Sequence, residues 1–125
     1  MASWDAALAG KQYVSLETFR RSGVGVRTAV WFASGRGGVL YVYTLAEAGK
    51  AKRVRANGRA RVAACDMRGR VTGDWFEASA RIVGAEEYAV GMGLIDRKYW
   101  PWKWLLDLAS SFRRRERVVI AVSPV

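Results

Sequence analysis

The chain has 125 residues, of which 51% are hydrophobic, and it carries a formal net charge of +10 at pH 7. This length and hydrophobic content fit one domain with a buried core, and they exclude a disordered tail or a pair of domains. No apolar run approaches the roughly 18 to 20 residues that span a bilayer, so we expect no transmembrane segment.

Two residue types that carry much of enzyme chemistry are missing or scarce. The sequence has no histidine and one cysteine, Cys65. This excludes an intramolecular disulfide and the Ser-His-Asp and Cys-His machineries, and we expect no metal site. An enzyme of this composition depends on a cofactor for its difficult chemistry. The N-terminal stretch MASWDAALAGK has no basic segment before a long apolar core, so we expect a cytoplasmic protein without a signal peptide.

Three short strands are predicted in the first third of the chain. Residues 12–19 alternate apolar and polar side chains, as a half-buried strand does. Residues 26–33 and 39–44 are rich in β-branched and aromatic side chains, which favour strands. The glycine-containing stretches RRSGVG and SGRGG separate the three segments as turns. Such short spacings favour an antiparallel meander.

The pattern then changes to that of a helix. Thr44 and Glu47 form the capping-box sequence T-x-x-E, and Asn57-Gly58 supplies a stop. We therefore predict a helix of about three turns between them.

The second half of the chain adds three strands and two helices. We predict a largely buried strand at 60–67, a long strand at 70–83 and a closing strand at 116–122. A helix is predicted at 85–100, and a further one at 101–112 that begins with Pro101. With six strands that follow one another in runs, the fold class is mainly β (α+β): a small antiparallel β-barrel with flanking helices.

The stretch at residues 44–62 concentrates positive charge against one carboxylate, Glu47. Its six cations are Lys50, Lys52, Arg53, Arg55, Arg59 and Arg61. At 100° per residue, Lys50 and Arg53 project to one side of the predicted helix. The positions on its only plausible inward face are Leu45, Ala48, Ala51, Lys52 and Arg55.

Two interpretations of these cations stay open at this point. They form a solvated face that complements the helix dipole, or they bind an anion. A phosphate suits the place, because the Thr44 hydroxyl, the first amides of the helix and the ammonium groups all donate hydrogen bonds. The preceding aromatic residues either form the wall for a flat ring or fill the barrel: Trp31, Phe32, Tyr41 and Tyr43.

The order of several motifs resembles that of a known family. RTAVWF, LYVYT, AGKAKRVRANGRARVAACDMRGRVTG and RKY are similar to segments of the pyridoxamine-phosphate-oxidase-like split β-barrel flavoproteins, and most similar to the branch of F420-dependent enzymes. The resemblance runs from about Tyr13 to Val122. It implies one domain, 1–125, with a six-stranded antiparallel split barrel of the FMN-binding type. It also implies a homodimer with two cofactor sites at the interface.

The resemblance further implies which residues hold F420 or, alternatively, FMN. The phosphate would bind Arg27, Thr44 and Lys50, with Lys52 and Arg55 as further partners. Thr28, Val30 and Trp31 would line the edge of the ring, and Tyr43 precedes the phosphate-binding threonine as it does in the family. Two departures are Ala29, where the family usually has proline, and Phe32-Ala33, where FMN enzymes often have a second basic residue.

The sequence thus predicts an F420-dependent oxidoreductase that transfers a hydride from the reduced deazaflavin to an unsaturated planar substrate. No general acid stands out, and Tyr43 and Tyr99 are the candidates for a proton donor. The alternatives within this fold are an FMN-binding oxidoreductase and a cofactor carrier. An alternative of another class is a basic nucleic-acid-binding module, against which stands the lack of a groove-reading helix or RNA-binding signature. Residues 99–115 suit either membrane contact or a helix that covers the core.

Overall fold

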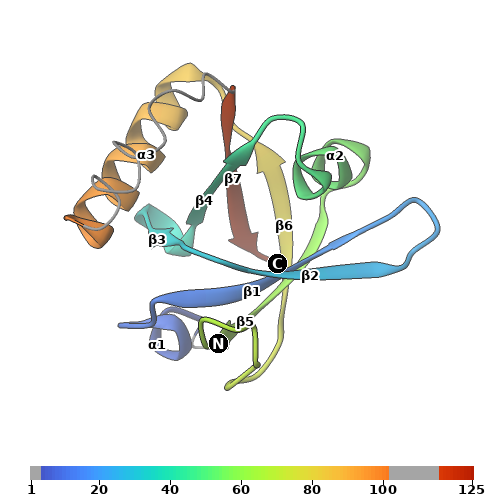
Figure 1. The fold of residues 1–125 in the computed structure, drawn as a ribbon, viewed down its shortest axis with the longest axis horizontal. Helices are drawn as coiled ribbons and strands as arrows, with labels where there is room; N and C mark the ends of the chain where they lie inside the picture. The colour runs from blue at the N-terminus through green and yellow to red at the C-terminus, as the bar shows by residue number, and fades with distance from the viewer. Residues whose placement is uncertain (1–3, 102–115) are drawn as a thin grey trace.

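The computed structural model describes residues 4–101 and 116–125. Figure 1 shows a strongly curled sheet with helices at its edges. The strands are β1 (Tyr13–Phe19), β2 (Gly25–Val30), β3 (Ala33–Ser34), β4 (Leu40–Leu45), β5 (Arg59–Cys65), β6 (Phe76–Ile82) and β7 (Arg117–Pro124). The helices are α1 (Trp4–Leu8), α2 (Gly49–Ala56), α3 (Ala85–Tyr99) and the short 3₁₀ turn η1 (Arg36–Gly38). The prediction of a mainly β fold with flanking helices is confirmed.

The strands form one antiparallel sheet in the order β2-β1-β5-β6-β7-β4-β3. The two edge strands, β2 and β3, are separated in the chain only by Trp31 and Phe32. The chain therefore runs from one edge of the sheet straight to the other, so the sheet curls almost into a closed barrel (Figure 1). The predicted strand 26–33 is broken at this crossing, which is why the described residues contain seven strands and not six.

Alternating side chains build two apolar layers. Those inside the barrel come from every strand except the two-residue β3, with Val14, Leu16, Val42, Val62 and Ile120 all at most 1% exposed. The opposite face of β4 and β7 packs against α3 through Tyr41, Val119, Ile95 and Tyr99. The period of two along β4 and β7 thus assigns their residues alternately to the barrel interior and to the α3 face.

The capping box predicted at Thr44 and Glu47 is wrong. Thr44 still belongs to β4, where it pairs with Val118, and α2 begins only at Gly49. The residue before the helix, Ala48, provides no side-chain cap. The predicted end is confirmed, because Asn57 closes α2. The helix is eight residues long, shorter than the three turns expected.

The remaining elements agree with the sequence to different degrees. The strands predicted at 12–19, 39–44, 60–67 and 116–122 and the helix predicted at 85–100 are confirmed within a few residues. The long strand expected at 70–83 is shorter, because residues 71–75 contribute only a bridge from Val71 to Cys65 and one backbone hydrogen bond to Ala64. Most of the helix predicted at 101–112 lies outside the described residues. No helix in the described ranges is long and apolar enough to cross a membrane.

Candidate functional site

The inner face of α2 is set by two small apolar residues. Ala51 and Val54 are 0% and 5% exposed, and Val54 joins the apolar interior of the barrel. Lys50 and Arg53 each precede one of them and are half-buried. The helix thus turns one lysine and one arginine towards the end of the barrel, where it covers the strands in Figure 1.

The prediction that Lys52 and Arg55 face inward is wrong, because both side chains are exposed. The guanidinium of Arg55 donates a 2.9 Å hydrogen bond to the Ala46 carbonyl. The error comes from counting Leu45 and Ala48 as helical residues, although they lie in β4 and in the turn before α2. Whether Lys52 and Arg55 bind a cofactor stays a prediction.

The inward cations, Lys50 and Arg53, donate hydrogen bonds to hydroxyl groups. Lys50 Nζ donates to Thr44 Oγ1 at 3.4 Å, and Arg53 Nε donates to Thr18 Oγ1 at 2.6 Å. Within residues 4–101 and 116–125, neither cation forms an ion pair with a carboxylate. Burial and the nearby Arg53 lower the pKa of Lys50, and burial and Arg20 lower the pKa of Arg53. We call Arg20, Lys50 and Arg53 with the two threonines the cationic cluster.

The first turn of α2 adds backbone donors to this cluster. A Cβ atom on Gly49 would lie 2.7 Å from Arg53 Nη1, so the glycine lets the guanidinium rest against the start of the helix. The helix has no side-chain cap at Ala48, which leaves its first amides and the positive end of its dipole available. Because each threonine oxygen already accepts a hydrogen bond from a cation, its proton is free to donate. This set of donors fits a phosphate group.

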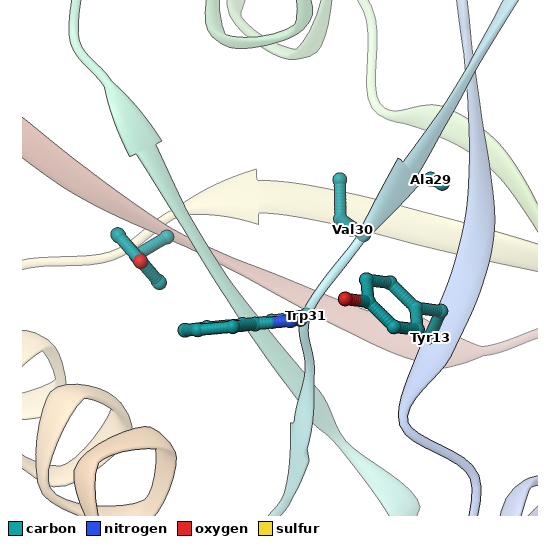
Figure 2. Close-up of a pocket in the computed structure, with 5 residues that line it drawn as sticks. Tyr13, Ala29, Val30 and Trp31 are labelled. Atoms are coloured by element: carbon teal, nitrogen blue, oxygen red, sulfur yellow. The ribbon is translucent and has the colours of Figure 1, made fainter. Parts of the chain in front are cut away.

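A second feature is an aromatic pocket of about 330 Å³. Its lining residues come from β1, the end of β2 and β4: Tyr13, Ala29, Val30, Trp31 and Tyr43. In Figure 2, Tyr13 projects from β1 and Trp31 from the segment that follows β2, and Val30 lies above the two rings. The structure therefore brings together Val30, Trp31 and Tyr43, three of the residues predicted to lie along a cofactor ring.

Tyr99 fixes the position of Trp31. Their rings stack with centroids 4.3 Å apart and planes within 7°. The Tyr99 hydroxyl lies within hydrogen-bond distance of the carbonyls of Gln12 (2.7 Å) and Phe32 (3.0 Å), and it accepts from the Phe32 amide at 3.0 Å. Burial raises the pKa of Tyr99 to about 12. Tyr99 therefore acts as a clamp between α3 and the barrel, and its proton is not placed for transfer to a substrate.

The pocket and the cationic cluster lie on the two faces of the same end of β4. Tyr43 faces α3 and the pocket, whereas the next residue, Thr44, points to the opposite face. On its outer edge β4 pairs with β3 only at Leu40 and Tyr41. In the described part of the chain, the rest of that edge is therefore open.

Two predicted ligands have other neighbours. The Arg27 guanidinium donates to the Glu17 carboxylate at 3.2 Å and lies 4.4 Å from the centre of the Trp75 ring. Thr28 pairs with Leu16, and its hydroxyl is buried without a hydrogen-bond partner among the described residues. Neither residue lines the aromatic pocket. Their roles at a cofactor stay predictions.

Some residues of the site were not foreseen. Arg53 was predicted to lie on the side of α2 away from its inward face, and Tyr13 was not predicted as a pocket residue. Val54 could have indicated the inward position of Arg53. It is the largest apolar side chain inside α2, so its position shows which side of the helix is buried. No local pattern indicates Tyr13, whose contact with the pocket depends on how the sheet curls.

The fold is similar to those of several solved structures. The conserved hypothetical protein Rv2991 from Mycobacterium tuberculosis has a TM-score of 0.72 at 21% identity, over 99% of this chain and 81% of that one. HutZ, the heme storage protein from Vibrio cholerae, has a TM-score of 0.72 at 12% identity, over 97% and 87%. An F420 reductase has a TM-score of 0.63 at 21% identity, over 100% and 95%. Comparisons with protein-family models and with curated proteins found no match.

This likeness shows that the chain has the fold of these solved structures, in agreement with the split barrel that the motifs implied. By their names, one of the similar structures is a reductase linked to F420 and another stores heme. The same fold thus serves different cofactors in different proteins, and the chemistry must be argued from the residues of this chain.

Proposed function

We propose that this protein is an F420-dependent oxidoreductase. The observation that carries the proposal is the cationic cluster: half-buried Lys50 and Arg53 face two threonine hydroxyls, and no carboxylate of residues 4–101 and 116–125 is paired to them. Buried cations without a counter-charge are costly, so a protein retains them mainly where a ligand supplies the negative charge. F420 joins a flat deazaflavin ring to a phosphate and a tail of glutamates, and the site has a place for each part.

Each part of the cofactor has its own residues in the proposal. The ring lies against Trp31 and Tyr43 in the aromatic pocket, and the connecting chain passes round the open edge of β4. The phosphate binds Lys50, Arg53, Thr44 and the first amides of α2. The exposed side chains of Lys52 and Arg55 meet the glutamate tail, which suits their outward position better than the phosphate contact first predicted for them.

F420, when reduced, supplies the hydride that is transferred to an electron-poor C=C or C=N bond of a planar substrate. The chain contributes binding and orientation. The Trp31 ring, fixed by Tyr99, presents a rigid wall, and the apolar pocket excludes water from one side of the bound ring. With the Tyr99 hydroxyl engaged by backbone groups, the proton for the substrate comes from solvent or from Tyr43.

Heme is a weaker candidate for this chain than a flavin-like cofactor, although a heme storage protein has a similar fold. The chain has no histidine, the residue that most often ligates heme iron in globins and peroxidases. FMN remains the alternative on the same residues. The homodimer and the cytoplasmic location stay predictions.

The test is a fluorescence titration of the purified protein with F420 and, separately, with FMN. We expect tight binding of F420 and weaker binding of FMN, because only F420 has a tail that meets Lys52 and Arg55. Preference for FMN would keep the site and overturn the choice of cofactor. Binding of neither would overturn the proposal.

Matched lysine variants sharpen the titration. Lys50→Ala removes a phosphate contact, and we expect both cofactors to lose affinity by about thirtyfold, equivalent to roughly 2 kcal/mol. Lys52→Ala should weaken F420 only, by severalfold, because the exposed lysine meets the tail. Arg68→Ala changes an exposed cation that belongs neither to the cationic cluster nor to the lining of the aromatic pocket, and it serves as the control. Equal effects of the Lys50 and Arg68 variants would contradict the phosphate assignment.

A further inference from the structure

A second cavity, of about 520 Å³, lies between α3 and the η1 turn. We call it the α3 cavity, and it is lined by Ser34, Gly35, Arg36, Tyr41, Val90 and Leu94. Its volume is in the range of sites that take small organic ligands. It is separate from the aromatic pocket, with which it shares no lining residue.

One wall of the α3 cavity is rigid. A Cβ atom on Gly35 would lie 2.6 Å from the Tyr41 ring, and one on Gly91 would lie 3.1 Å from it, so the ring is held between two glycine backbones. The Tyr41 hydroxyl donates to Glu87 at 2.8 Å, and Arg81 holds the same carboxylate with two hydrogen bonds of 2.8 and 2.9 Å. A wall fixed in this way loses little freedom when a ligand binds.

The opposite wall is apolar and open to solvent. Val90 and Leu94 are four residues apart and therefore lie on the same side of α3. Val90 is 55% exposed and is one of five large exposed hydrophobic residues in the described ranges. A flat apolar group between this wall and the Tyr41 ring would cover all three side chains.

The charge at the cavity comes from Arg36. Its side chain is exposed, and no carboxylate of the described residues forms an ion pair with it. The nearby Glu87 is already paired with Arg81 and Tyr41. An arginine without a counter-charge beside an apolar hollow matches a carboxylate, which it can bind with two parallel hydrogen bonds.

We infer that the α3 cavity is a second binding site, independent of the proposed cofactor site, for a small organic carboxylate with a flat apolar body. The body lies between the Tyr41 ring and the Val90–Leu94 wall, and the carboxylate pairs with Arg36. Ser34 supplies a hydroxyl at the same rim.

The test uses isothermal titration calorimetry with 1-naphthoate and its neutral analogue 1-naphthamide. We expect one equivalent of naphthoate to bind and naphthamide to bind more weakly. Arg36→Gln should lower naphthoate affinity at least tenfold and leave naphthamide unchanged. Val90→Trp, which places an indole in the cavity from an exposed position, should abolish binding of both compounds. Arg68→Gln removes an exposed cation elsewhere and should change neither.

Each outcome decides the inference. Absence of naphthoate binding to the unmodified protein would overturn it. So would unchanged naphthoate affinity in Val90→Trp, because the compound would then occupy another place such as the aromatic pocket. Equal losses of naphthoate affinity in Arg36→Gln and Arg68→Gln would mean that the overall charge of the protein causes the loss, and they would overturn the pairing with Arg36. If Val90→Trp unfolds at a lower temperature than the parent, Leu94→Phe repeats the test, and chemical-shift changes of the Val90 and Leu94 methyl groups in the parent locate the compound directly.

Discussion

Two groups of cations lie on the barrel, and they differ in what surrounds them. Arg27 and Arg61 share the carboxylate of Glu17, each at 3.2 Å, and both guanidinium groups lie within 5.0 Å of the Trp75 ring centre. Lys50 and Arg53 in the cationic cluster have hydroxyl groups as partners and no paired carboxylate among the described residues. The same kinds of side chain thus have a counter-charge within the fold in one place and hydroxyl partners in the other, where the proposed phosphate would supply the negative charge.

The presence or absence of a paired carboxylate distinguishes cations that stabilise the fold from cations that are candidates for binding a ligand. Net charge alone cannot distinguish the two groups, since all four residues add equally to it. A cation beside a carboxylate has its counter-charge within the fold, whereas a half-buried cation without one raises the energy of the folded state until a ligand binds. Removing a charge should therefore have opposite effects on stability at the two places.

The largest effect is expected at Glu17. The Glu17 side chain is 9% exposed, and Glu17→Gln keeps its shape while leaving Arg27 and Arg61 without their shared counter-charge. We expect a loss of about 2 kcal/mol in the free energy of unfolding, below the full cost of a broken buried pair because both arginines are partly exposed. Urea unfolding of the parent protein and of Glu17→Gln measures this loss.

The control for this substitution is Glu77→Gln. Glu77 pairs with Arg61 at 3.0 Å, but its side chain is 58% exposed, so we expect a loss of no more than about 0.5 kcal/mol. A Glu17 variant as stable as the Glu77 variant would show that the shared carboxylate contributes little. The two groups of cations would then not differ in the way described here.

The sequence predicted the elements of the fold better than their placement. The alternation in residues 12–19 and the stop at Asn57 are local, so they predicted β1 and the end of α2 correctly. The break between β2 and β3 was missed because Trp31 and Phe32 continue the apolar pattern. The crossing from one sheet edge to the other is a consequence of barrel closure, which no local pattern encodes.

The same distinction holds for the candidate site. Thr44 and Lys50 were predicted together, and the structure places them in contact. The inward face of α2 was predicted on the wrong side, because in an eight-residue helix two flanking residues counted as helical, Leu45 and Ala48, are enough to change which side is assigned as buried. Arg27 was assigned from the resemblance to the family, and its ion pair with Glu17, ten positions earlier in the chain, is visible only when β1 and β2 pair.

Lys98 differs from both groups of cations, because its ammonium group lies over aromatic rings. Its Nζ lies 3.5 Å from the centre of the Phe32 ring, and burial lowers the pKa of Lys98 from 10.5 to about 8. Above the folded-state pKa, the unfolded chain binds a proton that the folded chain does not, so stability rises with pH until the unfolded lysine also titrates. We expect a rise of about 1 kcal/mol between pH 7.5 and 9.5, reduced from the full shift because the side chain is only half-buried.

The measurement compares urea unfolding of the parent protein and Lys98→Met across this range. Burial raises the pKa of Cys65, whose titration lowers stability at high pH in both proteins, so the difference between them isolates Lys98. The rise should be absent from the variant. A difference that does not change with pH would mean that the aromatic rings keep Lys98 protonated in the folded state up to the pKa of a free lysine.

The smallest effect, and the one that tests the cationic cluster most directly, is expected at Lys50. Lys50→Met keeps the length of the side chain and removes a half-buried charge whose pKa is lowered by burial and by the nearby Arg53. We expect the free energy of unfolding to rise by about 0.5 kcal/mol, whereas Lys52→Met on the exposed face of α2 should leave it unchanged within a few tenths. Added inorganic phosphate should stabilise the parent and the Lys52 variant, and stabilise the Lys50 variant less, because at a given concentration a ligand of the folded state raises stability less when it binds more weakly. A Lys50 variant that is less stable than the parent, and equally responsive to phosphate, would place this lysine with the structural cations around Glu17.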